Sequence, residues 1–170
     1  DRVWCTPELA DWHLGCQHEV RHPFTGAEPG GWGWSDLSGA VPDSDDTPAA
    51  ILALDHMKSS LDDVRKQRCE KAIKAGRGWL LRLQNRDGGW PTFCRGWGKL
   101  PFDRSSNDLT AHALRALAVN DISAAEAGTA RHITSGTRFL EKNQEPDGSW
   151  LPLWFGNQDR AGEPNPVYGT

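Results

Sequence analysis

Hydrophobic and small residues recur with a helical period in two long stretches of the chain. Between residues 63 and 84 they return about every 3.6 positions, which is typical of one buried helix face. These residues are Val64, Cys69, Ala72, Ile73, Gly76, Leu80 and Leu83. The stretch 123–144 opens with Ser123-Ala-Ala-Glu126, a capping-box pattern, and continues through Ile133, Thr137 and Leu140. The spacing therefore predicts helices over 63–84 and 123–144.

Shorter helices are predicted over 47–57 and 107–119. Thr47 followed by Pro48 suits an N-cap and the first position of a helix. The segments 85–89 and 145–148 combine Asp with Gly, the residues that favour tight turns. Each unit is therefore expected to contain two helices and a turn. Only residues 150–155 show the short apolar alternation of a strand.

A pattern of aromatic, Leu, Gln, Gly and Trp residues occurs twice along the chain, 60 positions apart. Its two copies are Trp79, Leu80, Gln84, Gly88 and Trp90, and Phe139, Leu140, Gln144, Gly148 and Trp150. A looser third copy consists of Trp12, Gln17, Gly30 and Trp32. Self-similarity at a fixed period indicates a repeat architecture. We therefore interpret residues 1–170 as a single fragment with three repeats, at 12–34, 79–90 and 139–150.

Composition excludes several classes of protein. The net charge of −4 and the pI of about 5.8 do not fit a nucleic-acid-binding surface. No apolar run approaches the roughly 18 residues of a membrane-spanning helix, and no signal peptide is visible. The four cysteines lack the CxxC spacing of a zinc site and are expected to be reduced thiols. Hydrophobic residues make up 37% of the chain, which is low for a self-sufficient helical core and favours a fragment of a larger solenoid or toroid.

An acidic cluster comes directly before the predicted helix 47–57. Asp43, Asp45 and Asp46 lie within four residues, so at least one is expected to hold its proton more tightly than a free Asp. A carboxyl group that stays neutral at pH 7 can act as a proton donor. The alternative is a turn that caps the helix. The pair Asp45-x-Thr47 is repeated 63 residues later as Asp108-x-Thr110.

Two motifs resemble those of one enzyme family. The tract from Trp79 to Trp90 resembles the QW motif of squalene–hopene and oxidosqualene cyclases, and Asp43-x-Asp45-Asp46-Thr47 resembles their DxDDT acid motif. The resemblance extends from Trp12 to Thr170. It implies an all-α fold, an α/α toroid of terpenoid cyclase-like helical repeats, of which this chain would form a partial barrel.

The resemblance also implies roles for individual residues. Asp45 would be the general acid, and His112, in the tract Asp108-Leu109-Thr110-Ala111-His112, would be its partner. Asp108 would orient His112, while Asp43 and Asp46 would favour protonation of Asp45. Tyr168, in Tyr168-Gly169-Thr170, would belong to the water network that returns the proton.

Two tryptophans are candidates for the substrate cavity. Trp34 lies 11 residues before Asp45, where the family has an aromatic residue that stabilises carbocations. Trp154 follows Trp150 by four residues and matches another cavity tryptophan. Packing in the core is the alternative for both. Trp32, Trp90 and Trp150 are expected to be structural.

The implied activity is that of a class II triterpene cyclase, which protonates and cyclises squalene or a related linear polyprenoid. No cofactor or metal is implied, because the reaction is a redox-neutral isomerisation. The expected partners are the polyprenoid, a membrane surface on the cytoplasmic side for the full-length monotopic protein, and a second copy in a homodimer. The isolated fragment is expected to be inactive.

Departures from the motifs leave substrate and product open. Pro48 replaces the usual Ala, Ala40-Val41 replaces aromatic residues, and extra residues separate Trp154 from Tyr168. Two other functions remain as alternatives. One is a non-catalytic repeat protein that binds a lipid or a partner. The other is a prenyltransferase β-subunit-like toroid, which needs a zinc-ligand set that the sequence does not show.

Overall fold

The computed structural model describes residues 4–98, 101–119, 127–153, 156–157, 159–160, 162–165, 167 and 170. Within these residues the chain forms five α-helices: α1 (Pro7–Gly15), α2 (Asp46–Lys58), α3 (Asp63–Leu83), α4 (Asn107–Ala118) and α5 (Ala127–Lys142). A 3₁₀-helix spans Pro101–Asp103. None of the described helices is both long and apolar enough to cross a membrane.

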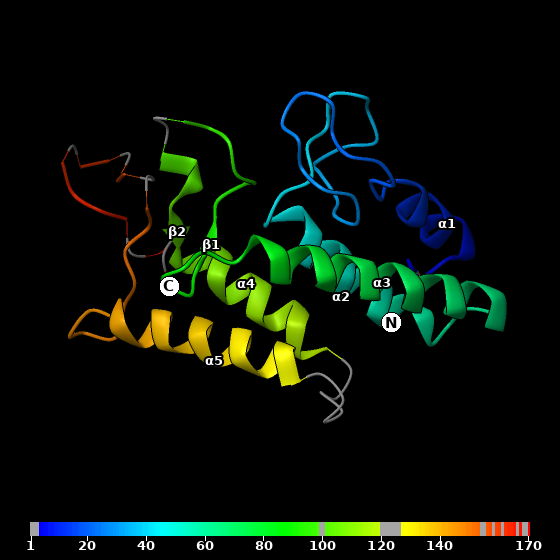
Figure 1. Ribbon diagram of the computed structural model, residues 1–170. Helices are drawn as coiled ribbons and strands as arrows, with labels where there is room; N and C mark the ends of the chain where they lie inside the picture. Colours follow the sequence, from blue (N-terminus) through cyan, green and yellow to red (C-terminus); the bar gives the residue numbers. More distant parts are fainter. Residues whose placement is uncertain are drawn as a thin grey trace.

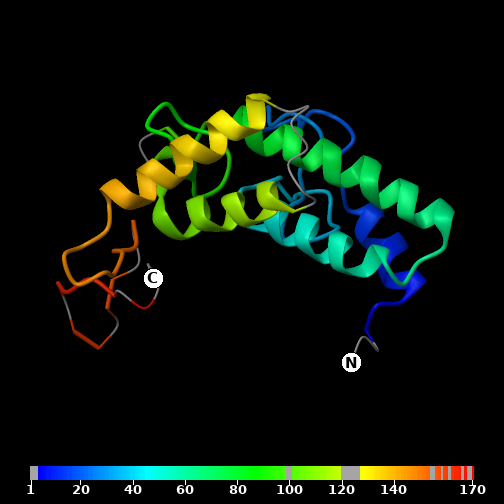
Figure 2. The same ribbon diagram turned by 90° about the horizontal axis from the view of Figure 1, so that it is seen from below.

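The helices alternate between two layers. Figure 2 shows α2 and α4 side by side in one layer, with α3 and α5 in the other. Figure 1 shows α1 and α5 at opposite ends of this arrangement, and α2 packs against both α3 and α4. The fold is therefore all-α, in agreement with the expected partial α/α toroid.

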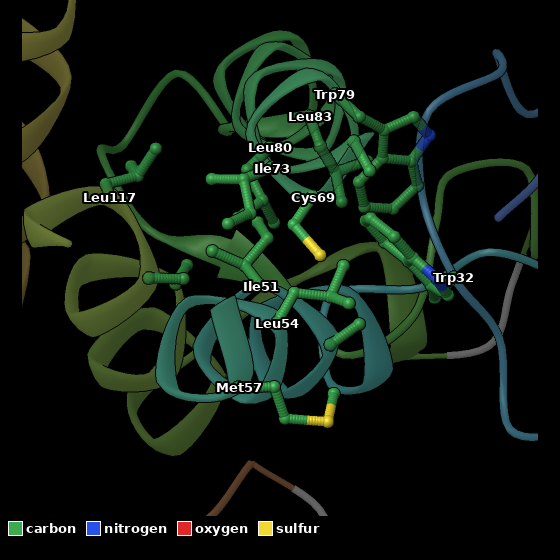
Figure 3. Close-up of a cluster of buried hydrophobic side chains, with 14 of the residues drawn as sticks. Trp32, Ile51, Leu54, Met57, Cys69, Ile73, Trp79, Leu80, Leu83 and Leu117 are labelled. Atoms are coloured by element: carbon green, nitrogen blue, oxygen red, sulfur yellow. The ribbon is translucent and has the colours of Figure 1, made fainter. Parts of the chain in front are cut away.

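The core lies mainly between α2 and α3. Ile51, Leu54 and Met57 on α2 are each at most 1% exposed. Ile51 and Leu54 point toward the buried stripe of α3, in which Cys69, Ile73 and Leu80 are labelled in Figure 3, whereas Met57 lies on the side of α2 away from α3. The side chains that give residues 63–84 their helical period are thus the ones that hold the two layers together.

The predicted helices agree closely with the observed ones. The predictions 47–57, 63–84 and 107–119 each end within one or two residues of α2, α3 and α4. The prediction 123–144 is confirmed over α5, although the proposed capping box Ser123–Glu126 lies outside the described residues.

Two short features were not predicted. Helix α1 lacks a clear apolar period, but Thr6 caps it by accepting a hydrogen bond from the N–H of Leu9, and Pro7 opens it. Strands β1 (Trp90–Pro91) and β2 (Ser105–Ser106) pair antiparallel and are too short for an alternating pattern. The strand candidate at 150–155 is wrong for residues 150–153, which form no strand, and residues 154–155 lie outside the described part.

Candidate active site

Three tryptophans are hydrogen-bonded to threonines. In each pair the backbone N–H of the tryptophan donates to the threonine Oγ1, over 2.9 to 3.0 Å. The pairs are Trp32–Thr47, Trp90–Thr110 and Trp150–Thr170. The first two threonines lie in the first turn of α2 and α4, so the backbone at each tryptophan fixes where these helices begin.

Each indole N–H donates a hydrogen bond to the carbonyl of a residue in the α-helix that precedes it in the chain, α1, α3 or α5. Trp32 Nε1 donates to the His13 carbonyl at 2.9 Å, and Trp90 Nε1 donates to the Leu80 carbonyl at 2.8 Å. Trp150 Nε1 makes the equivalent bond to Leu140 at 2.8 Å. Trp32 and Trp90 are at most 2% exposed, which agrees with the expected structural role.

Asp43 caps the start of α2. Its Oδ1 accepts hydrogen bonds from the N–H groups of Asp45 at 2.9 Å and Asp46 at 2.7 Å, and the side chain is buried. Its own N–H donates to the carbonyl of Trp32 at 3.0 Å. The helix-cap interpretation of the acidic cluster is therefore correct for Asp43, and capping does not prevent this carboxyl group from holding a proton.

Burial decides which carboxyl groups hold their protons. Loss of contact with water raises the pKa of Asp43 to about 8, and the neighbouring charge of Asp46 adds to this, while the two N–H groups oppose it. Burial also raises the pKa of Asp46, with a further increase from the charge of Asp45. Both shifts favour the protonated form, so the two carboxyl groups that flank Asp45 in the sequence ionise less readily than a free Asp.

Asp45 and His112 are brought together from two helices. His112 Nδ1 on α4 lies 3.3 Å from Asp45 Oδ1 at the start of α2. The side chain of Asp45 is 66% exposed and that of His112 is 25% exposed. The pair that the resemblance implied is thus in contact, although 67 residues separate the two in the sequence.

Asp108 lies at the start of α4, close to this pair. Burial raises the pKa of Asp108, the charge of Asp45 raises it further, and the charge of His112 opposes both. Its carboxylate accepts a hydrogen bond from the hydroxyl of Ser106. Asp108 thus interacts electrostatically with Asp45 and His112. Its described side-chain hydrogen bond is to Ser106, so its predicted role of orienting His112 stays a prediction.

Trp34 lies beside the acidic cluster. It is 61% exposed and lines a pocket of about 190 Å³ together with Trp12, Trp32 and Asp46. An indole face at the edge of a pocket that contains an acid is suitably placed for a cation, although Trp34 is not enclosed. The other cavity candidate, Trp154, and the candidate Tyr168 lie outside the described residues.

Ser44 is a site residue that the sequence did not reveal. It lies between Asp43 and Asp45 and is fully buried. Its N–H donates to the Phe93 carbonyl at 3.1 Å, and its hydroxyl donates to the carbonyl of Pro91. The acidic cluster is therefore attached directly to the turn of the next repeat.

Comparison with known families places the chain clearly. The family described as "Squalene-hopene cyclase C-terminal domain" matches residues 10–170, which is nearly the whole chain. A squalene–hopene cyclase of Bradyrhizobium diazoefficiens is 30% identical over 154 residues, covering 84% of this chain and 21% of the relative. Sporulenol synthase of Bacillus subtilis is 31% identical over 160 residues, covering 86% and 22%. The chain thus spans about a fifth of the length of these curated relatives.

A solved structure shares the fold. A family 10 polysaccharide lyase from Cellvibrio cellulosa superposes with a TM-score of 0.59, covering 88% of this chain and 52% of the lyase. The sequence identity is 18%, so this likeness concerns the helical architecture alone.

Proposed function

Because the chain belongs to the squalene-hopene cyclase C-terminal domain family, we propose that it forms part of a class II triterpene cyclase that protonates and cyclises squalene or a related linear polyprenoid. The observation that carries the proposal is the 3.3 Å contact between Asp45 and His112. It joins the acidic cluster to a basic side chain, beside a pocket lined by tryptophans.

Protonation of an alkene places opposing demands on the acid. An isolated C=C bond is a very weak base, so its proton donor must be strong and yet protonated when the substrate arrives. The buried carboxyl groups of Asp43 and Asp46 favour retention of a proton in the cluster, because each further negative charge there is unfavourable. A protonated His112 beside Asp45 favours the carboxylate once the proton has left. The proposed acid chemistry would use both of these interactions.

The initiating step can be written from these groups. The π electrons of the terminal alkene form a C–H bond with the proton of Asp45, the electrons of the broken O–H bond stay on the carboxylate, and the other alkene carbon becomes cationic. Neighbouring double bonds then attack in turn and close the rings, and the last cation is discharged by loss of a proton or by capture of water. Asp43 and Asp46 are the nearest carboxyl groups from which the proton of Asp45 can be replaced, with Tyr168 and water as the proposed route from outside.

The cationic intermediates need stabilisation without a nucleophile. Trp34 presents an indole face beside Asp46, and Trp154 is proposed for the same role farther along the substrate. Cation–π attraction contributes about 0.5–2 kcal/mol for each ring, with the larger values in dry surroundings. In the full-length protein the remaining repeats would close the cavity over this face and exclude water.

The proposal extends to partners. A substrate as apolar as squalene is delivered from a lipid phase, so we propose that the full-length protein associates with a membrane surface. Its occurrence as a homodimer is proposed together with the cyclase activity. The family match favours the cyclase over a prenyltransferase β-subunit-like toroid. A non-catalytic lipid-binding repeat protein is the remaining alternative.

The test uses the full-length protein and its Asp45→Asn variant. Each is incubated with squalene in detergent, and the products are analysed by gas chromatography and mass spectrometry. We expect cyclic C30 products from the unchanged protein and at least about a hundredfold fewer from Asp45→Asn, since a positioned general acid contributes about 10²–10⁴-fold to a rate. Asp55→Asn, which changes a carboxylate farther along α2, is the matched control and should keep its activity.

Two outcomes would contradict the proposal. Equal product formation by Asp45→Asn would exclude Asp45 as the acid. The absence of products from every variant, with squalene and with shorter polyprenoids, would favour the non-catalytic alternative.

A further inference from the structure

Strand β1 contacts both helices that carry the Asp45–His112 pair. On one side, the N–H of Trp90 donates to Thr110 Oγ1 on α4 at 3.0 Å. On the other side, the carbonyl of Pro91 accepts the hydroxyl of Ser44, which directly precedes Asp45. Two adjacent residues of one strand therefore hold the start of α2 and the start of α4.

Both hydroxyl groups are completely buried and fully used. Ser44 and Thr110 are each 0% exposed. Thr110 Oγ1 accepts from Trp90 and donates to the carbonyl of Ser106 at 2.6 Å. Removing either hydroxyl would leave a buried backbone group without its partner, so the attachment resists small displacements.

The strand itself is firmly anchored. The indole of Trp90 donates to the Leu80 carbonyl at 2.8 Å, and its ring lies against Gly136, where a Cβ would approach it to 2.9 Å. Strand β1 is thus held in place by α3 and α5, and it in turn holds the starts of α2 and α4. A displacement of the acid or of the histidine would have to break one of these contacts.

The same arrangement recurs one repeat later, with a different side chain. Asn107 occupies the position equivalent to Ser44, three residues before the helix-start threonine, and its Nδ2 donates to the Leu151 carbonyl at 2.9 Å. Leu151 follows Trp150 just as Pro91 follows Trp90. A donor at this position that reaches the next repeat is therefore a feature of the fold, and in the first instance it is adjacent to the proposed acid.

We propose that Ser44 and Thr110 are positioning residues, which set the distance between Asp45 and His112 through their shared attachment to β1. The inference rests on the proposed cyclase function for its catalytic consequence. Ser44 is adjacent to Asp45, and Thr110 lies two residues before His112 in the same helical turn. Their common support makes the separation of acid and histidine independent of the exposed surface around them.

The distance at stake is sensitive to small movements. At 3.3 Å the contact between Asp45 and His112 is already near the upper limit for a hydrogen bond, so a shift of a few tenths of an ångström decides whether it exists. Displacements of about 1 Å in an active site can lower a rate by roughly 10²-fold. Ser44 and Thr110 therefore control turnover without touching the substrate.

The test compares variants that remove a hydroxyl with variants that keep it. Thr110→Val removes the hydroxyl and keeps the shape, Thr110→Ser keeps the hydroxyl, and Ser44→Ala removes the other one. In the full-length protein we expect kcat for squalene to fall about 10-fold to 100-fold in Thr110→Val and Ser44→Ala with KM little changed, and to recover in Thr110→Ser. Crystal structures of the same variants should show the Asp45 Oδ1–His112 Nδ1 distance lengthened in the first two and restored in the third.

The matched control is Ile73→Val, which removes a buried methyl group from α3 and leaves β1 intact. It should lower the resistance to urea by an amount similar to Ser44→Ala without changing kcat or the distance. The proposal is overturned if the distance stays at its original value in both hydroxyl-deletion variants, or if Thr110→Ser is as impaired as Thr110→Val. If Thr110→Val does not fold, Ser44→Ala alone decides by the same criteria. The distances decide even if the protein does not turn over squalene, so a failure of the proposed function is seen separately.

Discussion

The starts of α2 and α4 share one backbone arrangement and carry different chemical groups. Both begin beside a threonine that accepts a hydrogen bond from a buried tryptophan, Thr47 from Trp32 and Thr110 from Trp90. Two residues before each threonine is an Asp. The packing residues are therefore the same at the two helix starts.

The other positions differ in ways that matter for acid–base chemistry. Four residues before the threonine, α2 has the buried Asp43 and α4 has Ser106. Two residues after it, α2 has Ala49 and α4 has His112. Consequently the start of α2 carries a buried carboxyl group with a raised pKa, that of Asp43, and α4 carries an imidazole 3.3 Å from Asp45. The comparison teaches that the two helix starts have the same packing residues at a few fixed positions and different ionisable residues at the others.

The largest expected effect tests the shared packing. Trp32→Ala and Trp90→Ala should each lower the free energy of unfolding by about 3–5 kcal/mol, because each removes a buried ring together with a hydrogen bond to a helix end. Urea unfolding of the purified protein measures the loss. Trp12→Ala is the control, since Trp12 is 53% exposed, and it should lower the free energy by about 1 kcal/mol or less. If Trp90→Ala lowered the free energy of unfolding much less than Trp32→Ala, the two helix starts would not share the same packing.

A smaller effect tests the difference in buried charge. Because the pKa of Asp43 is about 8 in the folded protein and its ordinary value is 3.8, the folded state binds more protons than the unfolded state between these pH values. The free energy of unfolding should therefore fall as pH rises through this window. The contribution of Asp43 amounts to at most about 3 kcal/mol between about pH 5 and pH 7.

The variant Asp43→Asn tests this difference. Asn keeps an oxygen for the N–H groups of Asp45 and Asp46 but does not titrate, so the fall of the free energy of unfolding with pH should become shallower. Urea midpoints recorded at several pH values measure the slope, and parallel curves for Asp43→Asn and the unchanged protein would argue against a raised pKa at Asp43.

The smallest effect concerns the glycines under the tryptophan rings. A Cβ at Gly76 would come within 2.7 Å of the Trp32 ring, and one at Gly136 within 2.9 Å of the Trp90 ring. Gly76→Ala and Gly136→Ala should each lower the free energy of unfolding by about 1–3 kcal/mol through overpacking. Gly78 lies on α3 like Gly76, but a Cβ there meets only the end of the Arg82 side chain. Gly78→Ala should therefore raise the free energy of unfolding by about 0.5–1 kcal/mol. Thermal unfolding compares the three, and the same sign for Gly76→Ala and Gly78→Ala would be the contrary result.

Much of the fold was accessible from the sequence because periodic apolar residues report directly on burial. The stripe that includes Cys69, Ile73 and Leu80 predicted α3 almost to its ends. Helix α1 could not be found in this way. It is short, and of its residues only Ala10 is buried, so its position depends on contacts that a local pattern does not record. One of these is the ion pair of Asp11 with Arg65 on α3, over 2.8 Å.

The site was predictable in part, for a related reason. The repeated Asp-x-Thr placed Asp45 and Asp108 at equivalent helix starts, and the family resemblance added His112 as the partner of Asp45. The structure brings Asp45 and His112 to 3.3 Å. Which carboxyl group is buried could not be predicted, because Asp43, Asp45 and Asp46 are chemically identical until the turn directs Asp43 inward. The contact of Ser44 with Pro91 was equally inaccessible, since a hydroxyl bound to a backbone carbonyl 47 residues away leaves no pattern in the sequence.

The tryptophan–threonine contact has a consequence for how such a protein can change over generations. A duplicated unit that needs little more than Trp, Thr and a nearby Gly to dock leaves the positions between them open to substitution. Ala49 is exposed, stands where His112 stands one unit later, and lines the same pocket as Asp46. An Ala49→His substitution would therefore place an imidazole at this pocket from a solvent-exposed position. Protein engineers can use helix starts of this kind as ready-made places for new acids and bases.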